Sequence, residues 1–416
     1  MRPDEARATG RAAGSTLRHL TAAVRGAHGA VSDTVHDLLA QVIGPIARPV
    51  QHVQDTFAAG VYAGVGLGLD LAARAAGHVV AHQQRDDEDR PSVHDGAAAH
   101  HLLAIGLGLH GDTMARDSVE LAPALQLRRR HRRIHPTPEG LAGGYPDATG
   151  DVVVFVHGLF ETEAAWALGA PDRPSYAARL RSDLGFTPVL VRYNTGLRVS
   201  ESAADLDRLL TNLVAGWPVP LERLVLIGHS MGGLVVHGAL ALAESDDGQG
   251  QWHERVTDTV TLGTPHHGSP IARRVGHAVD RLEGTRRGRW LADFLRLRSD
   301  GIRDLMHGNV VRDDWIEHAR DDIADRRTHP VPADDIRHWG VVAVTAQGRL
   351  PVGLAQQVGD LVVPHDSATH ALPTPARRFC DDSVAVVAGV SHLGLLNDDR
   401  VYGQLRSWLR APTRAT

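Results

Sequence analysis

The stretch LVLIGHSMGGLVV, residues 224–236, constrains the fold of this chain more than any other feature of its sequence. Two short apolar runs flank a turn in which Gly228, Ser230 and Gly232 have the spacing G-x-S-x-G. A strand that enters this motif and leaves it as a helix is typical of a nucleophile elbow, where a sharp turn exposes the serine hydroxyl. The stretch therefore predicts a β/α unit that presents Ser230 as a nucleophile.

From residue 151 onward, short apolar runs alternate with segments of helical periodicity. DVVVFVHG and TPVLVRYN are nearly continuous apolar runs, as expected of buried parallel strands, and SYAARLRSDLG between them is helical. Further strands are predicted in LERLVLIGHS, RVTDTVTLG, HWGVVAVTAQG and DDSVAVVAGVSH. This alternation predicts an α/β fold with a largely parallel sheet.

The chain is expected to divide into a helical N-terminal region, residues 1–120, and an α/β domain, residues 121–416. Residues 270–335 interrupt the alternation with Arg-rich helical sequence, which predicts a cap or lid insertion. In the N-terminal region Gly60, Gly64 and Gly68 repeat every four residues, a spacing that lets a second helix approach closely. Residues 97–112 are the predicted partner of that helix.

Two interpretations of the N-terminal region stay open. In the first, its helices dock tightly on the rest of the protein; in the second, they form a hairpin that contacts a membrane surface. The basic run LQLRRRHRRIH, residues 125–135, is likewise compatible with an anionic partner or with an exposed edge strand, where charge prevents pairing between sheets. We favour docking for the first region, and an exposed edge strand or a linker for the second.

Composition excludes several classes of protein. A net charge of −5 gives no reason to expect a nucleic-acid partner, and the single cysteine, Cys380, excludes an internal disulfide. No stretch approaches the roughly 18 apolar residues of a membrane span, and the N-terminus lacks the apolar core of a signal peptide. We expect a cytoplasmic protein, with peripheral membrane contact through residues 1–120 as the alternative. The sequence does not indicate an oligomeric state.

Five segments together resemble the α/β-hydrolase superfamily, in particular its bacterial lipase and PGAP1-like branch. They are VFVHGLFETEAAW, IGHSMGGLV, VTLGTPHHGSP, VGDLVVP and VSHLGLLND. The resemblance covers residues 151 to about 400 and leaves residues 1–120 unmatched. It implies a sheet of the eight-stranded type and a catalytic triad in the chain order Ser, Asp, His.

The residues agree with a Ser230, Asp360, His392 triad. Serine is a weak nucleophile that needs a base, and the base needs an orienting acid. Asp360 follows the strand VVAVTAQG, and His392 follows the last strand. The competing acids are Asp366 and Asp381, and the competing histidines are His365 and His370.

The negative charge of a tetrahedral intermediate requires two backbone N–H donors. Met231, the residue after the nucleophile, is expected to supply one of them at the start of its helix. The resemblance implies that Leu159, after the His-Gly of VHGLF, supplies the other. His157 in the same motif is predicted to be structural.

No cofactor and no metal ion are predicted. His266 and His267 are adjacent, and adjacent side chains rarely converge on one ion, so we assign their loop to the mouth of the site. Some secreted lipases of the family carry an aspartate two residues after the catalytic histidine that helps to bind Ca²⁺. That position is Gly394 here, which argues against such a site.

The leading hypothesis is a serine esterase or lipase that acts on a small-molecule ester or lipid through an acyl-enzyme. A thioesterase, amidase or acyltransferase with the same triad is the alternative. A third hypothesis, of another class, is a membrane-associated interaction protein with a vestigial hydrolase domain. With an aromatic content of 4%, the chain offers no aromatic platform for sugars or bases.

Overall fold

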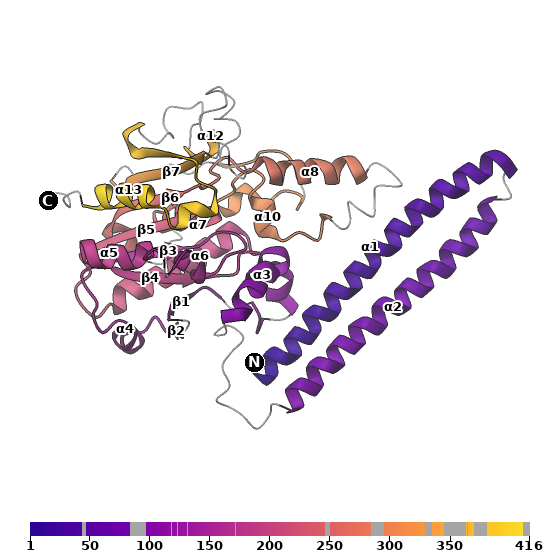
Figure 1. Cartoon of the computed structure of the whole chain (residues 1–416), viewed down its shortest axis with the longest axis horizontal. Coiled ribbons are helices and arrows are strands. Elements are labelled where there is room, and N and C mark those ends of the chain that lie inside the picture. The colour runs from indigo at the N-terminus through magenta and orange to yellow at the C-terminus, as the bar shows by residue number, and fades with distance from the viewer. Residues whose placement is uncertain are drawn as a thin grey trace. The chain divides into compact units, whose positions relative to one another are not determined.

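The computed structural model separates the chain into two compact units. One comprises Met1–Gly96, Thr113–Ala122 and Arg274–Arg298, and the other comprises Ala97–Asp112, Pro123–Arg273 and Ser299–Thr416 (Figure 1). The structure describes residues 1–43, 47–83, 97–117, 119–122, 124–130, 132–170, 172–245, 250–283, 295–320, 322–328, 335–344, 363, 365–369 and 381–410. We call the first unit the hairpin unit and the second the sheet unit.

Two long helices, α1 (Pro3–Ile43) and α2 (Ala47–Gln83), pack against each other in the hairpin unit. The glycines that permit this approach are Gly10 and Gly77: a Cβ added at Gly77 would lie 2.7 Å from the Ala6 carbonyl oxygen and 3.0 Å from the Cα of Gly10. At Gly64 and Gly68, an added Cβ would meet no described atom within 4 Å. The helical character predicted for this region is therefore confirmed. The helix that packs against α2 within the unit is α1, whereas the partner predicted for it, residues 97–112, belongs to the sheet unit.

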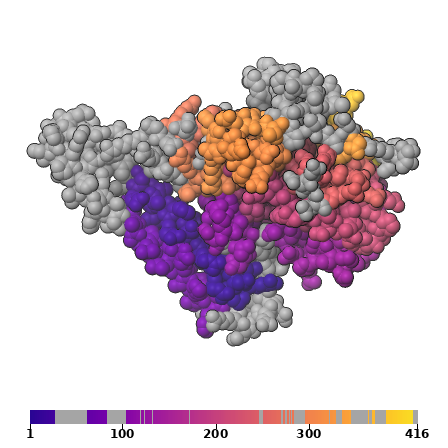
Figure 2. Space-filling model, turned by 180° about the vertical axis from the view of Figure 1, so that it is seen from behind, coloured from indigo at the N-terminus to yellow at the C-terminus, as the bar shows by residue number. Residues whose placement is uncertain are grey.

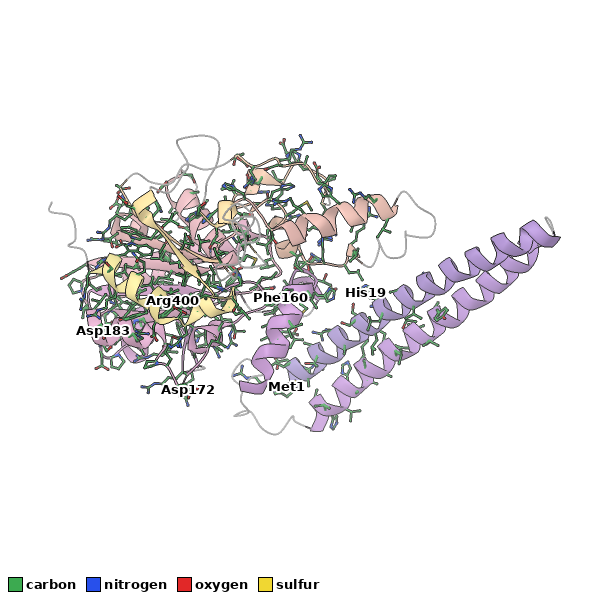
Figure 3. The ribbon with its side chains drawn as sticks, turned by 45° about the horizontal axis from the view of Figure 1, so that its top comes forward. Met1, His19, Phe160, Asp172, Asp183 and Arg400 are labelled. Carbon is green, nitrogen blue, oxygen red and sulfur yellow. The ribbon has the colours of Figure 1, made fainter. Side chains whose placement is uncertain are left out.

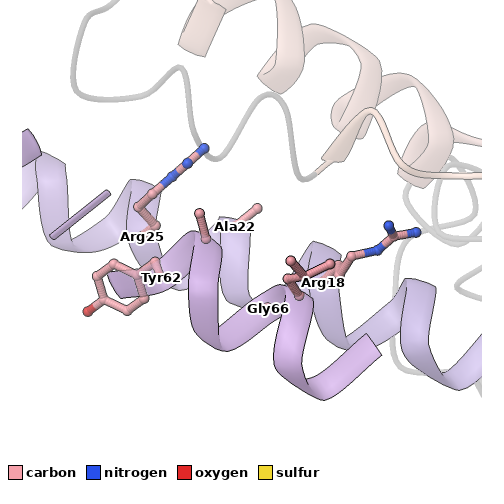
Figure 4. A pocket seen from close by; sticks show the side chains of 7 residues that line it. Arg18, Ala22, Arg25, Tyr62 and Gly66 are labelled. Atoms are coloured by element: carbon pink, nitrogen blue, oxygen red, sulfur yellow. The ribbon is translucent and has the colours of Figure 1, made fainter. Parts of the chain in front are cut away.

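A buried carboxylate, that of Asp70, also forms an ion pair between the two helices. Asp70 of α2 is buried and accepts from Arg74, at 2.9 Å, while Arg18 of α1 lies 3.4 Å away. Nearby, a groove runs between the helices and is lined by Arg18, Ala22, Arg25, Tyr62, Ala63, Gly66 and Leu67 (Figure 4). Among the described helices, none combines the length and hydropathy needed to cross a membrane.

The sheet unit contains an eight-stranded sheet with the order β2-β1-β4-β3-β5-β6-β7-β8. In this spatial order, each strand from β4 through β3 to β8 is parallel to its neighbour, whereas β1 pairs antiparallel with both β2 and β4. The strands are β1 (Gln126–Arg129), β2 (Arg132–Ile134), β3 (Asp151–Val156), β4 (Thr187–Arg192), β5 (Arg223–His229), β6 (Val256–Leu262), β7 (Arg337–Val344) and β8 (Val384–Ala388). The predicted α/β fold with a mostly parallel sheet is confirmed.

Helices precede, connect and follow the strands. They are α3 (Ala97–Asp117), which has a kink at His110 and crosses the boundary between units after Asp112, then α4 (Pro138–Gly144), α5 (Tyr176–Leu184), α6 (Val199–Gly216), α7 (Met231–Ala243), α8 (Pro270–Glu283), α10 (Asp300–Asp304), α12 (His365–Ala368) and α13 (Asp399–Leu409). Short 3₁₀ turns are η3 (Glu163–Ala167), η4 (Gln251–Arg255), η5 (Arg312–Asp314), η7 (Asp381–Ser383) and η8 (Leu393–Leu396).

The sheet separates two hydrophobic cores. Val152 and Val154 of β3 join one core, together with residues of α6 and α7, whereas Val153 and Phe155 join the other, with residues of α5 and α13. This alternation follows from the period of two in a strand, which directs successive side chains to opposite faces. Because both faces are covered, β3 is apolar at nearly every position, as its sequence predicted.

The basic run at residues 125–135 forms the antiparallel edge of the sheet, as predicted. Its arginines divide into two groups: Arg132 and Arg133 of the edge strand are exposed, while Arg128 of β1 is buried. Glu163 neutralises the buried side, since its carboxylate lies 2.5 Å from Arg192 and 3.4 Å from Arg128. Burial raises the pKa of Glu163, but the two arginines lower it by a larger amount, so the pKa lies below its ordinary value.

Within the predicted cap, residues 299–320 and 322–328 belong to the sheet unit, and Figure 2 shows this part in orange. Asp304 of α10 accepts from Arg198 at 2.7 Å and from the Val199 N–H at 2.8 Å, at the start of α6. Ser299 donates to the Gly108 carbonyl oxygen of α3 at 2.6 Å. The segment is therefore fixed by buried polar contacts to two helices of the same unit.

Candidate active site

Ser230 lies in the sharp turn between β5 and α7. Its backbone has φ 51° and ψ −123°. Residues other than glycine seldom adopt these angles, and the strain costs about 1–3 kcal/mol. The Ser230 N–H donates to the Leu262 carbonyl oxygen of the neighbouring strand β6 at 2.9 Å, which helps to hold the turn. This is the backbone geometry of a nucleophile elbow.

Glycines make that turn possible. A Cβ added at Gly228 would lie 2.5 Å from the Cα of Gly233, and one added at Gly232 would lie 2.2 Å from the Val156 carbonyl oxygen at the end of β3. Real Cβ atoms do not approach so closely, so the start of α7 could not lie against the ends of β5 and β3 with larger residues. The two glycines of G-x-S-x-G are therefore steric requirements of the elbow.

The predicted oxyanion donors border on the same turn. Met231 is the first residue of α7, directly after Ser230, and is fully buried. The loop after β3 lies against the serine, since a Cβ added at Gly158 would be 2.9 Å from the Cβ of Ser230. Leu159 is the next residue of that loop and packs on the hydrophobic core beside α6 and α7.

His392 reaches the same edge of the sheet from the other direction. It follows β8 and caps the 3₁₀ turn η8, and its ring lies against Gly263, where an added Cβ would be 3.1 Å from its Nδ1 and Cε1. Gly263 directly follows Leu262, the residue that accepts the Ser230 N–H. Ser230 and His392 are thus brought to adjoining positions at the carboxyl ends of β5 and β6.

The acid of the predicted triad, Asp360, lies outside the described residues, as does His370. Asp366 and His365 are in α12 and Asp381 is in η7, but the surroundings of these side chains are also outside the described part. The choice among the three acids therefore stays a prediction. It depends on the position of Asp360 in the sequence after β7.

His157 is completely buried in the core next to β4. Its ring stacks on Tyr193 with a centroid distance of 4.5 Å, and its Nε2 accepts from the Tyr193 N–H at 3.4 Å. Burial lowers the pKa of His157, so the ring is neutral near neutral pH. These surroundings are those of a packing residue.

The adjacent histidines of the GTPHHGSP loop have different partners. His266 is buried and stacks on His237 of α7 at 4.9 Å, while the backbone N–H of His267 donates to Ser367 at 2.9 Å. In the part of the chain that the structure describes, no three His, Cys, Asp or Glu side chains are arranged to hold a metal ion. An added Cβ at Gly394 would lie 2.9 Å from Val390, so that position has little room for a side chain.

Sequence reasoning did not single out two polar residues beside the serine, His229 and Glu161. His229 immediately precedes Ser230 at the end of β5, and its Nδ1 lies 2.9 Å from a carboxylate oxygen of Glu161. Glu161 also accepts from the Gly158 N–H at 2.7 Å. The signal available in the sequence was a carboxylate four residues after His157, in the loop that follows β3.

Helix α3 approaches this loop, although residues 97–112 were assigned to the N-terminal region. A Cβ added at Gly108 would lie 2.2 Å from the ring of Phe160, which Figure 3 labels beside this helix. Asn194 donates to the Gly111 carbonyl oxygen at 2.8 Å. The part of α3 within the sheet unit therefore packs next to the residue that follows Leu159.

The family described as the PGAP1-like alpha/beta domain matches residues 208–319. This segment includes the Ser230 elbow and the loop after β6, but not His392. No curated protein matches the chain.

Solved structures that match part of this chain include lipases from three bacteria. The mature form of lipase BlEst2 of Bacillus licheniformis has 18% identity and a TM-score of 0.39, covering 62% of this chain and 91% of its own. Staphylococcus hyicus lipase has 14% identity and a TM-score of 0.38, with coverage of 63% and 95%. Phospholipase PlaB from Legionella pneumophila has 15% identity and a TM-score of 0.36, with coverage of 63% and 60%.

Because these TM-scores are low, the fold is assigned from the strand order of the chain itself and from the elbow at Ser230. Both agree with the motifs of the sequence, and the matched family is the one that those motifs resembled. The chain therefore has the α/β-hydrolase fold and resembles the lipase-like, PGAP1-like branch of that superfamily.

Proposed function

We propose that this chain is a serine hydrolase that cleaves carboxylic esters, as lipases and esterases do. The observation that carries the proposal is the strained elbow at Ser230, with the His392 ring against the glycine that follows β6. A backbone strained at one polar residue, beside a histidine from a distant strand, supports a catalytic role for both.

In the proposed mechanism, the Ser230 hydroxyl oxygen attacks the ester carbonyl carbon as His392 takes up the hydroxyl proton. The carbon–oxygen bond of the ester breaks, the alcohol leaves with that proton, and the acyl group stays on Ser230. Water then attacks the acyl-enzyme, again with His392 as the base, and releases the acid. Asp360 is the proposed acid that orients the imidazole.

The oxyanion of each tetrahedral intermediate would be bound by the backbone N–H groups of Met231 and Leu159. The contact between Gly158 and Ser230 supports this assignment, because it puts the loop after β3 beside the nucleophile. The N-terminus of α7 adds the favourable end of a helix dipole. One donor of this kind is typically worth about 10²–10³ in kcat.

Exposed apolar side chains next to these residues support an acyl group of apolar character. Phe160, one residue after Leu159, is 41% exposed, and Leu393, one residue after His392, is 53% exposed. Ile105 and Leu109 of α3 are also exposed. They precede and follow Gly108 in the sequence, the glycine that contacts the Phe160 ring. Apolar surface of this kind near a reactive serine suits a fatty-acyl ester better than a charged substrate.

The test is labelling with a fluorophosphonate, followed by a substrate panel. Wild-type protein should be labelled at Ser230, and the Ser230→Ala variant should not. A panel of p-nitrophenyl esters of increasing acyl length, acyl-CoA thioesters and amides then compares ester hydrolysis with the alternative acyl donors. Absence of labelling in folded wild-type protein would instead support a vestigial hydrolase domain with a role in interactions.

Peripheral membrane contact through residues 1–120 is part of the same proposal as an alternative to a purely soluble enzyme. Exposed apolar residues on α2, among them Val65, Leu69 and Val79, support it. Co-sedimentation of the full chain with vesicles of anionic and of zwitterionic lipid tests it. Recovery of all the protein in the supernatant with both would eliminate the contact.

A further inference from the structure

A buried chain of polar contacts connects the loop after β3 to the backbone of His392. The Gly158 N–H donates to Glu161 Oε2 at 2.7 Å, and His229 Nδ1 lies 2.9 Å from Glu161 Oε1 and 3.1 Å from Oε2. On the other side of the same ring, His229 Nε2 lies 3.2 Å from the His392 carbonyl oxygen. The side chains of His229 and Glu161 are 0% and 9% exposed, so water competes little for these contacts.

The partners of His229 determine its protonation. A carboxylate faces Nδ1 and a carbonyl oxygen faces Nε2, and both groups accept hydrogen bonds. Each nitrogen must carry a proton to serve its acceptor, and an imidazole with two protons is a cation. The geometry therefore corresponds to an imidazolium–carboxylate pair.

Among the described groups, those that interact with Glu161 leave its negative charge in place. Burial raises the pKa of Glu161, but His229 and the Gly158 N–H lower it, and the net pKa lies below its ordinary value. His157 and Tyr193 also interact with Glu161. Burial lowers the pKa of His157 and raises that of Tyr193, so both are neutral near pH 7.

We infer that Glu161 and His229 form a positioning pair, which couples the proposed oxyanion loop to the backbone of His392. The ring of His229 also lies beside the ring of His392, the proposed base, with 4.8 Å between the two centroids. Glu161 orients the Gly158 peptide next to Leu159, and the His229 ring holds the carbonyl of His392 and with it the start of η8. The two halves of the proposed site, which come from β3 and β8, are thereby fixed against a single ring at the end of β5.

This inference rests on the proposed function for its effect on rate, but the charged state of His229 is testable without any substrate. In ¹⁵N-labelled wild-type protein, the ring of His229 should show protons on both nitrogens near pH 7. The His229→Gln variant identifies its signals by their absence. In Glu161→Gln, the second proton should be lost at lower pH than in wild type, because the carboxylate that stabilises the imidazolium is gone.

The rate of ester hydrolysis should depend on the protonation state of His229. In Glu161→Gln, kcat is expected to fall roughly 10- to 100-fold with little change in KM, since a small misplacement of catalytic groups has effects of this size. The loss should be greatest at the pH values where His229 becomes neutral, so the alkaline limb of kcat should begin at lower pH than in wild type. His229→Gln is neutral at every pH and should lower kcat without moving that limb.

Glu163→Gln is the matched control, because it removes a buried carboxylate two residues away that pairs with Arg192 and Arg128. It should lower the melting temperature but leave the alkaline limb in place. The double variant Glu161→Gln/His229→Gln should lose no more activity than the worse single variant if the pair acts as a unit. A wild-type His229 with one ring proton near pH 7 would overturn the inference, as would additive losses.

Failure of the inference and failure of the proposed function are distinguishable. Wild-type protein that reacts with the fluorophosphonate but shows a neutral His229 contradicts only the positioning pair. Protein that does not react but has a doubly protonated His229 contradicts the proposed hydrolase activity and leaves the ion pair as a structural one. If Glu161→Gln does not fold, His229→Gln and the wild-type spectra still decide the point.

Discussion

Close backbone approach through glycine occurs in two regions of this molecule, with different consequences. At the elbow, Gly228, Gly232 and Gly233 let α7 start against the ends of two strands. In the hairpin unit, Gly10 and Gly77 let α1 and α2 approach until an added Cβ would lie 3.0 Å from the opposing Cα. The elbow glycines fix the position of one reactive side chain, whereas the hairpin glycines only bring two helices together.

The difference explains why one glycine pattern was informative and the other was not. G-x-S-x-G lies between an apolar strand and an apolar helix, so its neighbours determine which backbone segments must meet. A glycine every four residues defines one face of a helix but does not say what that face meets. A Cβ added at Gly64 or Gly68 would meet none of the described atoms within 4 Å, and the close contact with α1 is made at Gly77.

The largest expected effect is at the elbow. Ser230→Ala should reduce ester hydrolysis by about 10³-fold or more, because the nucleophile is lost while the geometry of the turn is kept. Steady-state kinetics on a p-nitrophenyl ester measures the loss, and circular dichroism checks the fold. More than a few per cent of wild-type activity in clean, folded variant protein would end the assignment of Ser230.

His392→Ala and Asp360→Asn should each lower kcat by roughly 10³-fold, because the members of a triad act together. His392→Ala removes the general base, and Asp360→Asn removes the carboxylate that stabilises the imidazolium. Asp366→Asn and Asp381→Asn, measured under the same conditions, are the controls for the acid. If either of these is the more damaging acid variant, Asp360 is the wrong choice.

A smaller effect, on stability and not on rate, is expected in the hairpin unit. Gly77→Ala puts a Cβ 2.7 Å from the Ala6 carbonyl oxygen, and overpacking of this kind costs about 1–3 kcal/mol. Gly64→Ala, in the same helix, meets open space and should gain up to about 1 kcal/mol from helix propensity. Melting curves followed by circular dichroism should therefore shift in opposite directions.

Both hairpin variants should keep wild-type kcat and KM, because neither touches the elbow. This pair tests the comparison most directly. Equal shifts in melting temperature would show that the packing of α1 on α2 does not depend on Gly77. A loss of kcat in Gly77→Ala would show that the hairpin contributes to the site.

The smallest expected effect is that of a chelator. EDTA should change neither the rate nor the melting temperature, because Gly394 offers no carboxylate at the position where some relatives of the family bind Ca²⁺. Assays before and after dialysis against EDTA, with Ca²⁺ added back, check this. A loss that Ca²⁺ reverses would require a metal site elsewhere in the chain.

Most of the sheet could be predicted, because a strand buried on both faces must be apolar throughout. β3 and β5 met that condition, and so the order of strands and helices followed from the sequence. The edge strand β2 was predicted from its charge. The two units could not be predicted, because they recombine segments such as residues 113–122 that are distant in sequence from their partners.

The candidate site could be proposed from the sequence where a residue type has a fixed relation to a strand end. Ser230 follows β5 directly and His392 lies four residues after β8, and their surroundings meet at Leu262 and Gly263. Glu161 and His229 were missed because their role depends on a contact across 68 residues of sequence, which no local pattern encodes. The same holds for the contact of Phe160 with α3.

The positive φ at Ser230 has a consequence for engineering. A glycine would adopt φ 51° without the strain that a serine suffers there, so Ser230→Gly should be the more heat-resistant molecule. Selection of variants for survival at high temperature alone would favour exactly the change that removes the nucleophile. Any thermostabilisation of this chain must therefore be screened on turnover at every round, and not only on recovery of folded protein.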